Sequence, residues 1–305
     1  MIPVARLLLF SCLANVAVLA AQDDSRPPVI DMHLHSPVFG DTVQAIDTWL
    51  TELDRLNVRK AVLAAFPDNL AAWVPQAPDR LLPALTFPCL PRSFLGRPCF
   101  DDQADFPNLD WLRGEISAGR IQILAEIISQ LFGISPADSR LEPYFALADE
   151  LDIPVGLHMG PGPIAVGASR SILAQFPEFR TAAGNPLELD QVLRKYPNLR
   201  LFIMHAGWPM LDEMIAILHH HPNVYVEVGN LQFIITREAY YFYLWRLVEA
   251  GYGDRIMFGS DGGLGNLEEG IQAILEAEFL TEAQKRDILY HNAARFLRLP
   301  DEDGE

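Results

Sequence analysis

Short apolar runs alternate along the chain with longer stretches whose apolar residues recur every three or four positions. Near-continuous apolar runs such as 61–66 suit strands that are covered on both faces, as in a parallel sheet. The runs predict eight strands, at Val29–His35, Lys60–Phe66, Leu81–Phe87, Gln122–Ile127, Pro154–His158, Leu201–His205, Asn223–Val228 and Arg255–Ser260.

The stretches between these runs have the periodicity of amphipathic helices. Asp41 and Gln44 have the spacing of a capping box at the start of the first helix. Later helices are predicted over Leu187–Tyr196, Trp208–His220, Arg237–Gly251, Leu267–Phe279 and Glu282–Leu297. Eight strand–helix repeats in one domain predict an α/β fold, a single-domain (β/α)8 TIM barrel. The long connection 88–120 is expected to fold over the barrel mouth.

The first twenty residues have the layout of a cleavable secretory signal. Arg6 precedes a short apolar run, and small residues around Ala20 end it. The run is shorter than the ~20 residues of a spanning helix, which argues against stable membrane insertion. We therefore expect cleavage near Ala20, a mature domain over 21–305, and a secreted or periplasmic protein.

The mature chain would be strongly acidic. Cleavage would remove Arg6 and no acidic residue, which leaves 22 basic and 40 acidic side chains. Such a surface repels phosphate backbones, so nucleic acid is excluded as an expected partner. A small anionic substrate would need local arginine or metal charge. Barrels of this kind often form homodimers, but no segment of the sequence specifies an interface.

Two cysteines remain in the mature chain, Cys89 and Cys99, in a proline-rich loop. In an oxidising compartment they are candidates for a disulfide. Two buried, unpaired thiols are an equally good interpretation of the sequence. Neither cysteine has the surroundings of a nucleophile or of a zinc ligand.

Polar residues gather where the predicted strands end. Four of the eight histidines lie at such positions, and Asp261 follows the last strand. In a (β/α)8 barrel, reactive residues lie at the carboxyl ends of the strands. The residues concerned are His33 and His35 on the first strand, His158 on the fifth, His205 on the sixth, Asp261 after the eighth and Glu126 near the end of the fourth.

Imidazole and carboxylate groups in this arrangement suit a catalytic Zn2+ ion. His33 and His35 are two residues apart on one strand, so their side chains are expected to point the same way. His158 and Asp261 would complete the site. Asp261 would take the proton of a metal-activated water and later give it to the leaving group, while His205 would orient the water or polarise a carbonyl oxygen.

These motifs resemble the landmarks of the amidohydrolase superfamily, and most of all its amidohydrolase-related branch. The similarity rests on segments 31–35, 156–158, 204–207, 259–261 and 292–297, in the expected order along the mature chain. It implies a TIM barrel and a metal site. It does not name a reaction, because the branch contains hydrolases, lactonases and non-oxidative decarboxylases.

The resemblance leaves the number of ions open, and Glu126 is the residue that decides it. With one ion, which we favour, His33, His35, His158 and Asp261 hold the metal and Glu126 is hydrogen-bonded to a ligand histidine. With two ions, Glu126 bridges them, and His158 and His205 serve the second.

Three functions are compatible with this site. The first is hydrolysis of an ester, lactone or amide of a small molecule by metal-activated water. The second is non-oxidative decarboxylation of an unsaturated or aromatic acid, for which Arg92, Arg97 and Arg170 are candidate cationic groups. The third is a non-catalytic metal-binding barrel, against which the intact ligand set argues. Arg170 and Trp73 are candidate substrate-binding residues.

Overall fold

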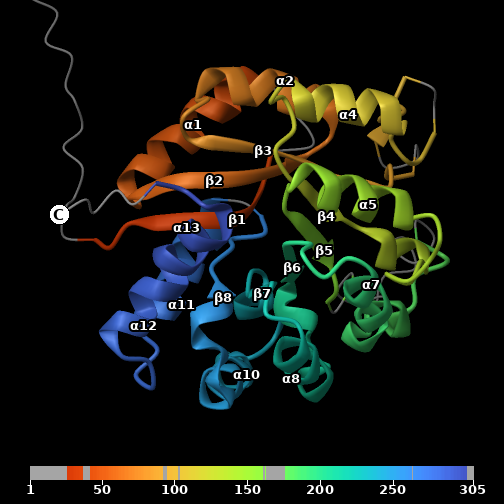
Figure 1. Cartoon of the computed structure of the whole chain (residues 1–305). Helices are drawn as coiled ribbons and strands as arrows, with labels where there is room; N and C mark the ends of the chain where they lie inside the picture. The colour runs from red at the N-terminus through yellow and green to blue at the C-terminus, as the bar shows by residue number, and fades with distance from the viewer. Residues whose placement is uncertain are drawn as a thin grey trace, which may run out of the picture.

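The computed structural model describes residues 26–36, 42–91, 95–101, 104–160, 162, 176–262 and 264–300. Eight parallel strands alternate with helices, as the apolar pattern predicted (Figure 1). The strands are β1 Val29–His35, β2 Val58–Ala65, β3 Leu81–Leu85, β4 Leu124–Ile127, β5 Val155–His158, β6 Leu201–Met204, β7 Val224–Glu227 and β8 Ile256–Met257.

The strands pair in sequence order, β1-β2-β3 in one group and β4 to β8 in the other. Backbone hydrogen bonds join the two groups at both seams. At the β3–β4 seam the Leu85 amide donates to the Ile123 carbonyl at 3.0 Å, and at the β8–β1 seam the Met32 amide donates to the Phe258 carbonyl at 3.0 Å. The eight strands therefore form the predicted (β/α)8 ring.

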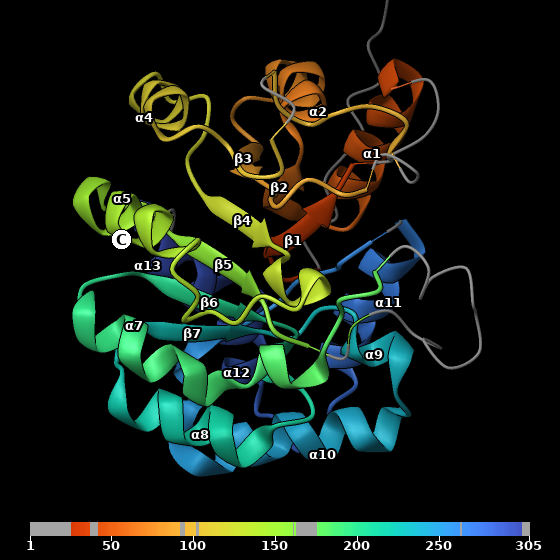
Figure 2. The same ribbon diagram turned by 90° about the vertical axis from the view of Figure 1, so that its right-hand side faces the viewer.

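Helices cover the outside of the strands. In Figure 2, α1, α2 and α4 lie on the side of β1 to β3, whereas α7, α8 and α10 lie on the side of β5 to β7. The α-helices are α1 Thr42–Arg55, α2 Pro67–Trp73, α4 Leu109–Ser117, α5 Glu142–Leu151, α7 Leu189–Lys195, α8 Leu211–His220, α9 Leu231–Ile234, α10 Arg237–Leu247, α11 Leu264–Leu275, α12 Glu282–Arg286 and α13 Asn292–Leu297.

The inside of the barrel is filled by apolar side chains, not by solvent. Ile30, Met32, Phe202 and Met257 belong to one fully buried cluster, against which Phe296 of α13 packs. A second, larger cluster lies between the strands and the surrounding helices. This packing leaves the carboxyl ends of the strands as the place where polar groups can gather.

The last strand and the closing helix differ from their predicted bounds. β8 has two residues: the next amide, that of Phe258, donates to the Ile288 carbonyl outside the sheet. Ser260 is held by the Asp31 side chain, to which its amide donates at 2.9 Å (Oδ1) and its hydroxyl at 2.6 Å (Oδ2). The predicted helix 282–297 is interrupted by a π-helical turn at Asp287–His291. Thr281 and Gln284 form the capping box at its start.

Part of the connection 88–120 lies at the mouth of the barrel, whereas α4 packs beside α5. The connection contains α4 and a disulfide between Cys89 and Cys99. Leu90 and Leu95 of this connection line a cavity together with His35 of β1. Because Cys89 and Cys99 are bonded to each other, the interpretation with two unpaired thiols is wrong.

Residues 1–25, including the predicted signal and Arg6, lie outside the described part of the chain. Within the described residues, no helix combines the length and the apolar character that crossing a membrane requires.

Candidate metal centre

Side chains from five strand ends converge at the carboxyl end of the barrel. They are buried to very different degrees: the His33 side chain is fully buried, and that of His35 is 30% exposed. The converging residues are His33 and His35 of β1, Glu126 of β4, His158 of β5, His205 directly after β6 and Asp261 after β8. The structure thus brings together all six candidate ligands that the sequence singled out.

One group of ligand atoms surrounds the end of β1. The Nε2 atoms of His33 and His35 lie 2.9 Å apart. Asp261 Oδ1 lies 3.3 Å and 3.2 Å from these two atoms. Glu126 Oε2 lies 3.6 Å and 3.4 Å from them. Both carboxylates therefore lie beside the same pair of histidine nitrogens.

A second group lies on the other side of Glu126. Its Oε1 atom is 2.5 Å from His158 Nδ1 and 3.5 Å from His205 Nε2. These two nitrogen atoms are 3.1 Å apart. The two carboxylate oxygens of Glu126 therefore face different pairs of histidines.

Both groups fit divalent metal ions. Metal–ligand bonds of about 2.0–2.2 Å place two ligands of one ion roughly 3–3.5 Å apart. The distances within each group cluster around this value, and the donors are imidazole and carboxylate groups, which divalent metals prefer. In His158 it is Nδ1 that faces the second group, while Nε2 is buried and has no hydrogen-bond partner among the described residues.

Three of the four histidines have their Nδ1 atoms committed to other acceptors. His33 Nδ1 lies 3.1 Å from Glu227 Oε2, His35 Nδ1 lies 2.9 Å from the Ala64 carbonyl, and His205 Nδ1 lies 3.0 Å from the Gly229 carbonyl. A proton on Nδ1 leaves the Nε2 lone pair free for a metal. Such bonds fix the tautomer and the orientation of metal-binding histidines.

Glu227 is the functional residue that the sequence analysis missed. It ends β7, is fully buried and accepts a hydrogen bond from the Gly229 amide as well as contacting His33. A Cβ atom on Gly229 or Gly259 would lie 2.4 Å or 2.3 Å from Glu227 Oε1, so both positions require glycine. The available signal was an acidic residue at the end of the seventh predicted strand.

The backbone at two ligands is in the left-handed region that favours glycine. His205 has a φ of 58° and Asp261 a φ of 45°. Non-glycine residues adopt this region at a cost, and they do so mostly where the surrounding structure demands it. Here it turns the chain at the strand end so that each side chain faces the cluster.

The two carboxylates of the cluster remain ionised. Burial alone would raise the pKa of Glu126, but the surrounding imidazoles, that of His158 foremost, hold this pKa well below its ordinary value. Burial opposes ionisation of Asp261 as well, and the surrounding imidazoles, that of His33 foremost, outweigh it, so the pKa of Asp261 is lowered. Both side chains are therefore acceptors only, as metal ligands must be.

A cavity of about 340 Å³ adjoins the cluster at His35 and Glu126. Its walls are mostly apolar, with three charged or amide side chains, Asp68, Asn69 and Arg97, towards α2 and the disulfide loop. The apolar lining includes Ala64, Phe66, Leu90, Leu95, Ile128 and Leu131. A small molecule with an apolar body would fit such a pocket.

The predicted substrate contacts have mixed outcomes. The prediction for Trp73 is wrong, because α2 directs its side chain towards α1 and not into the cavity wall. Trp73 lies in the core, 1% exposed, with its ring 6.5 Å from the Trp49 ring. Arg170 and Arg92 lie outside the described residues. Arg97 lines the cavity. His219 and His220 are exposed at the end of α8, away from the cluster.

Solved structures with this fold include enzymes of two reaction classes. One is a probable 2-pyrone-4,6-dicarboxylic acid hydrolase from Acinetobacter baumannii with bound citric acid, 16% identical, with a TM-score of 0.62 over 88% of this chain and 99% of that one. Another is a dihydroxybenzoic acid decarboxylase from Polaromonas with bound manganese and the inhibitor 2-nitroresorcinol, 15% identical, with a TM-score of 0.58 over 90% and 97%. These similarities show the shared fold.

A curated relative, protein fluG of Emericella nidulans, is 24% identical over 137 residues. The match covers 39% of this chain and 16% of that longer protein. The amidohydrolase-2 family model, described as Amidohydrolase, matches residues 104–299, which is more than half of the chain. Together with the barrel and its cluster of histidines and carboxylates, this match shows that the chain belongs to the amidohydrolase-2 family.

Proposed function

We propose that the protein is a metal-dependent hydrolase that cleaves an ester, lactone or amide bond of a small molecule. The observation that supports this most is the position of Glu126 between two histidine pairs, each with the spacing of metal ligands. The adjoining apolar cavity gives a substrate access to the cluster at His35 and Glu126.

The same observation supports two ions per chain over the single ion favoured from the sequence. His33, His35 and Asp261 would hold the first, His158 and His205 the second, and Glu126 would be shared. We propose zinc, because neutral imidazole and carboxylate ligands suit it; manganese has a similar preference for carboxylates. Bound divalent ions lower the pKa of a coordinated water from 15.7 to about 7 and so supply a nucleophile at neutral pH.

The chain's own residues supply the proton transfer and the orientation. Asp261 Oδ1 lies 3.3 Å and 3.2 Å from the Nε2 atoms of His33 and His35, and its side chain is 15% exposed, so it is placed to accept a proton at the cluster and return it to the leaving group. Glu227 keeps His33 oriented through the hydrogen bond to Nδ1. The Gly229 carbonyl does the same for His205.

Turnover of a panel of aryl esters, lactones and anilides tests the proposal. Metal-stripped protein should be inactive and should regain activity with zinc or manganese. Asp261→Asn should lose about 10²- to 10⁴-fold in kcat, the usual contribution of a general acid–base group. Asp138→Asn, at an exposed pair with Arg140, is the matched control and should keep full activity. Equal activity of stripped and loaded protein would contradict the proposal.

Decarboxylation of an unsaturated or aromatic acid is the second candidate. It is supported by the solved decarboxylase with the same fold and by Arg97 in the cavity wall, which offers a cation to an acid. The two reactions differ in their use of water. Incorporation of ¹⁸O from labelled water into the product indicates hydrolysis, and release of CO2 without such incorporation indicates decarboxylation.

We further propose that the protein acts outside the cytoplasm. The basic start and short apolar run of the first twenty residues support secretion. The disulfide between Cys89 and Cys99 agrees with an oxidising compartment. Mass spectrometry of protein exported by a bacterial host should show an N-terminus near residue 21, whereas an intact N-terminus would contradict cleavage.

A further inference from the structure

The loop closed by the disulfide forms one wall of the cavity next to the metal cluster. Leu95, Arg97 and Cys99 of this loop line the cavity. The adjacent part of the rim comes from the start of α2, where Asp68 is located. His35 and Glu126 line the same cavity at its metal end. The cavity thus joins the cluster to a rim with a charged pair.

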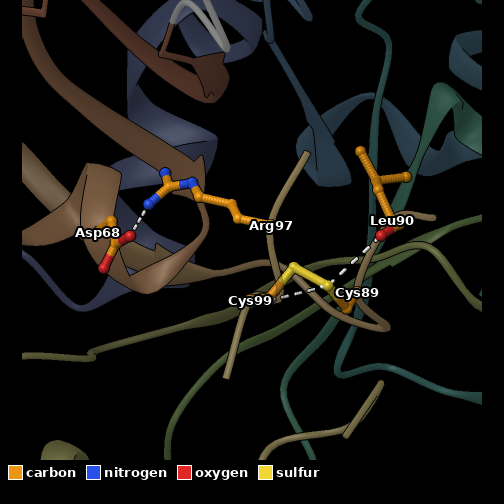
Figure 3. Close-up of a disulfide and its surroundings, with 5 residues drawn as sticks. All are labelled: Asp68, Cys89, Leu90, Arg97 and Cys99. Atoms are coloured by element: carbon orange, nitrogen blue, oxygen red, sulfur yellow. Dashed lines mark hydrogen bonds and ion pairs between the residues drawn. A yellow bond between two sulfur atoms is a disulfide. The ribbon is translucent and has the colours of Figure 1, made fainter. Parts of the chain in front are cut away.

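An ion pair of the side chain and a disulfide near it in the backbone hold Arg97 at this rim (Figure 3). Its guanidinium forms an ion pair with Asp68. Two residues further on, Cys99 is bonded to Cys89 and donates its backbone amide to Cys89 Sγ at 3.1 Å. Cys89 itself is 6% exposed, and its amide donates to the Asp105 carbonyl at 2.6 Å. The loop therefore holds Arg97 on a backbone anchored in the buried part of the molecule.

Arg97 brings a positive charge to the wall of the cavity. Among the described residues that line the cavity, Arg97 is the one arginine or lysine. The chain as a whole has a net charge of −17, which gives no general attraction for anions. A cation at this position is a local feature of the cavity.

Arg97 also retains capacity for a further partner. Its guanidinium has five N–H donors, of which the contact with Asp68 involves Nη1, and its side chain is 52% exposed. A planar guanidinium fork matches a carboxylate in a bidentate arrangement. An incoming carboxylate can thus join Asp68 at the guanidinium or replace it.

We propose that Arg97 is a specificity-determining residue that binds an anionic group of the substrate at the end remote from the metal. Asp68 is its partner when no substrate is bound, and the disulfide positions it. The inference rests on the proposed function, because the metal end of the cavity receives the reacting group. The substrate class is a small molecule with an apolar, preferably aromatic, body and a carboxylate opposite the reacting bond.

Calorimetric binding of two probes to the metal-loaded protein tests this inference without turnover. Terephthalate has a second carboxylate opposite the first, and benzoate lacks it. The wild-type protein should bind terephthalate more tightly. Arg97→Gln should weaken terephthalate binding roughly tenfold, the effect of one charge-assisted hydrogen bond at a half-exposed site, and should leave benzoate binding unchanged.

Three variants separate recognition from a structural role of the pair. Asp68→Asn removes the ion pair but keeps the arginine, so terephthalate should bind as well as before or more tightly. Cys89→Ser/Cys99→Ser should reduce the preference for terephthalate over benzoate. Arg113→Gln removes an arginine of α4 that pairs with Glu150, and it should change neither affinity.

Several results would overturn the inference. If Asp68→Asn and Arg97→Gln weaken terephthalate binding equally, the ion pair would serve to stabilise the loop and not to bind the substrate. No measurable binding of terephthalate at millimolar concentration, or an unchanged preference in Arg97→Gln, would remove the anion site. Each of these can occur while metal-dependent turnover persists, and a preference that depends on Arg97 can occur without turnover, so this inference and the proposed function fail separately.

Discussion

The strand-end cluster and the disulfide loop lie at the same end of the barrel, yet they are built differently. In the cluster, His33 is fully buried, and each of three histidines has its second nitrogen engaged by a fixed acceptor. At the loop, Arg97 and Asp68 are 52% and 69% exposed and are engaged mainly with each other. The residues of the cluster lie at the ends of regular strands, and a disulfide bond stabilises the loop.

This difference in burial suits two different roles: metal binding in the cluster and substrate recognition at the loop. Groups that bind metal must keep their positions to a few tenths of an ångström, and buried strand ends with fixed hydrogen bonds provide this. A group that recognises the far end of a substrate must stay accessible to solvent. Changes at the cluster should therefore abolish activity, whereas changes at the loop should alter affinity and stability.

The largest effect is expected for Glu126→Gln, which tests whether the cluster depends on a shared carboxylate. The amide keeps the size but loses the negative charge and one acceptor, so the second ion should be lost. Activity should fall about a thousandfold or more, from the several kcal/mol that a metal contributes to transition-state stabilisation. Metal analysis and kinetics check this. Glu142→Gln, at an exposed pair with Lys195, is the control; normal metal content in Glu126→Gln would refute the shared role.

A smaller effect is expected for Glu227→Gln, which changes a residue that contacts His33 and is not part of the cavity lining. The amide still fills the space between Gly229 and Gly259 but is a weaker partner for His33 Nδ1. Metal affinity should fall about 10- to 100-fold, as for other residues that orient ligands. Competition with a fluorescent chelator measures it. Unchanged affinity would mean that Glu227 serves the packing of β7 alone.

Removing the disulfide from the loop should lower the stability of the protein and leave its metal content unchanged. Cys89→Ser/Cys99→Ser opens a short loop, and the free energy of unfolding should fall by about 2–3 kcal/mol from the restored freedom of the unfolded chain. Urea unfolding of the metal-loaded protein measures this change, and metal analysis should show the wild-type content. Loss of metal in this variant would show that the two regions are not independent.

The smallest effect is expected for Arg113→Gln. Arg113 and Glu150 form an exposed ion pair between α4 and α5, close in sequence to the loop. Exposed pairs of this kind contribute little, so the melting temperature should change by no more than about 1–2 °C. Differential scanning calorimetry at low salt checks this. A larger drop would mean that α4 supports the loop through this pair.

The sequence predicted the barrel and the cluster well because both depend on local signals. Apolar runs marked every strand, and histidines at their ends marked the candidate ligands, including His158 and His205. The division of those ligands between two groups depends on which oxygen of Glu126 faces which ring, and strand periodicity carries no such information.

Other residues were missed or misplaced for related reasons. Glu227 acts through His33 on a strand 194 residues away in sequence, so no local motif connects them. Trp73 follows a strand, as substrate-binding residues often do, but the turn of α2 directs its ring towards Trp49 in the core. In both cases tertiary packing, and not the local pattern, determines the role.

Metal content per chain tests the central claim most directly. The protein would be loaded with zinc, dialysed against chelator-treated buffer and analysed by plasma mass spectrometry, with the folded state verified by circular dichroism. We predict about two ions per chain, since two groups of ligand atoms share Glu126. One ion per chain would contradict the shared carboxylate, and well-folded protein without bound metal would contradict the metal centre itself.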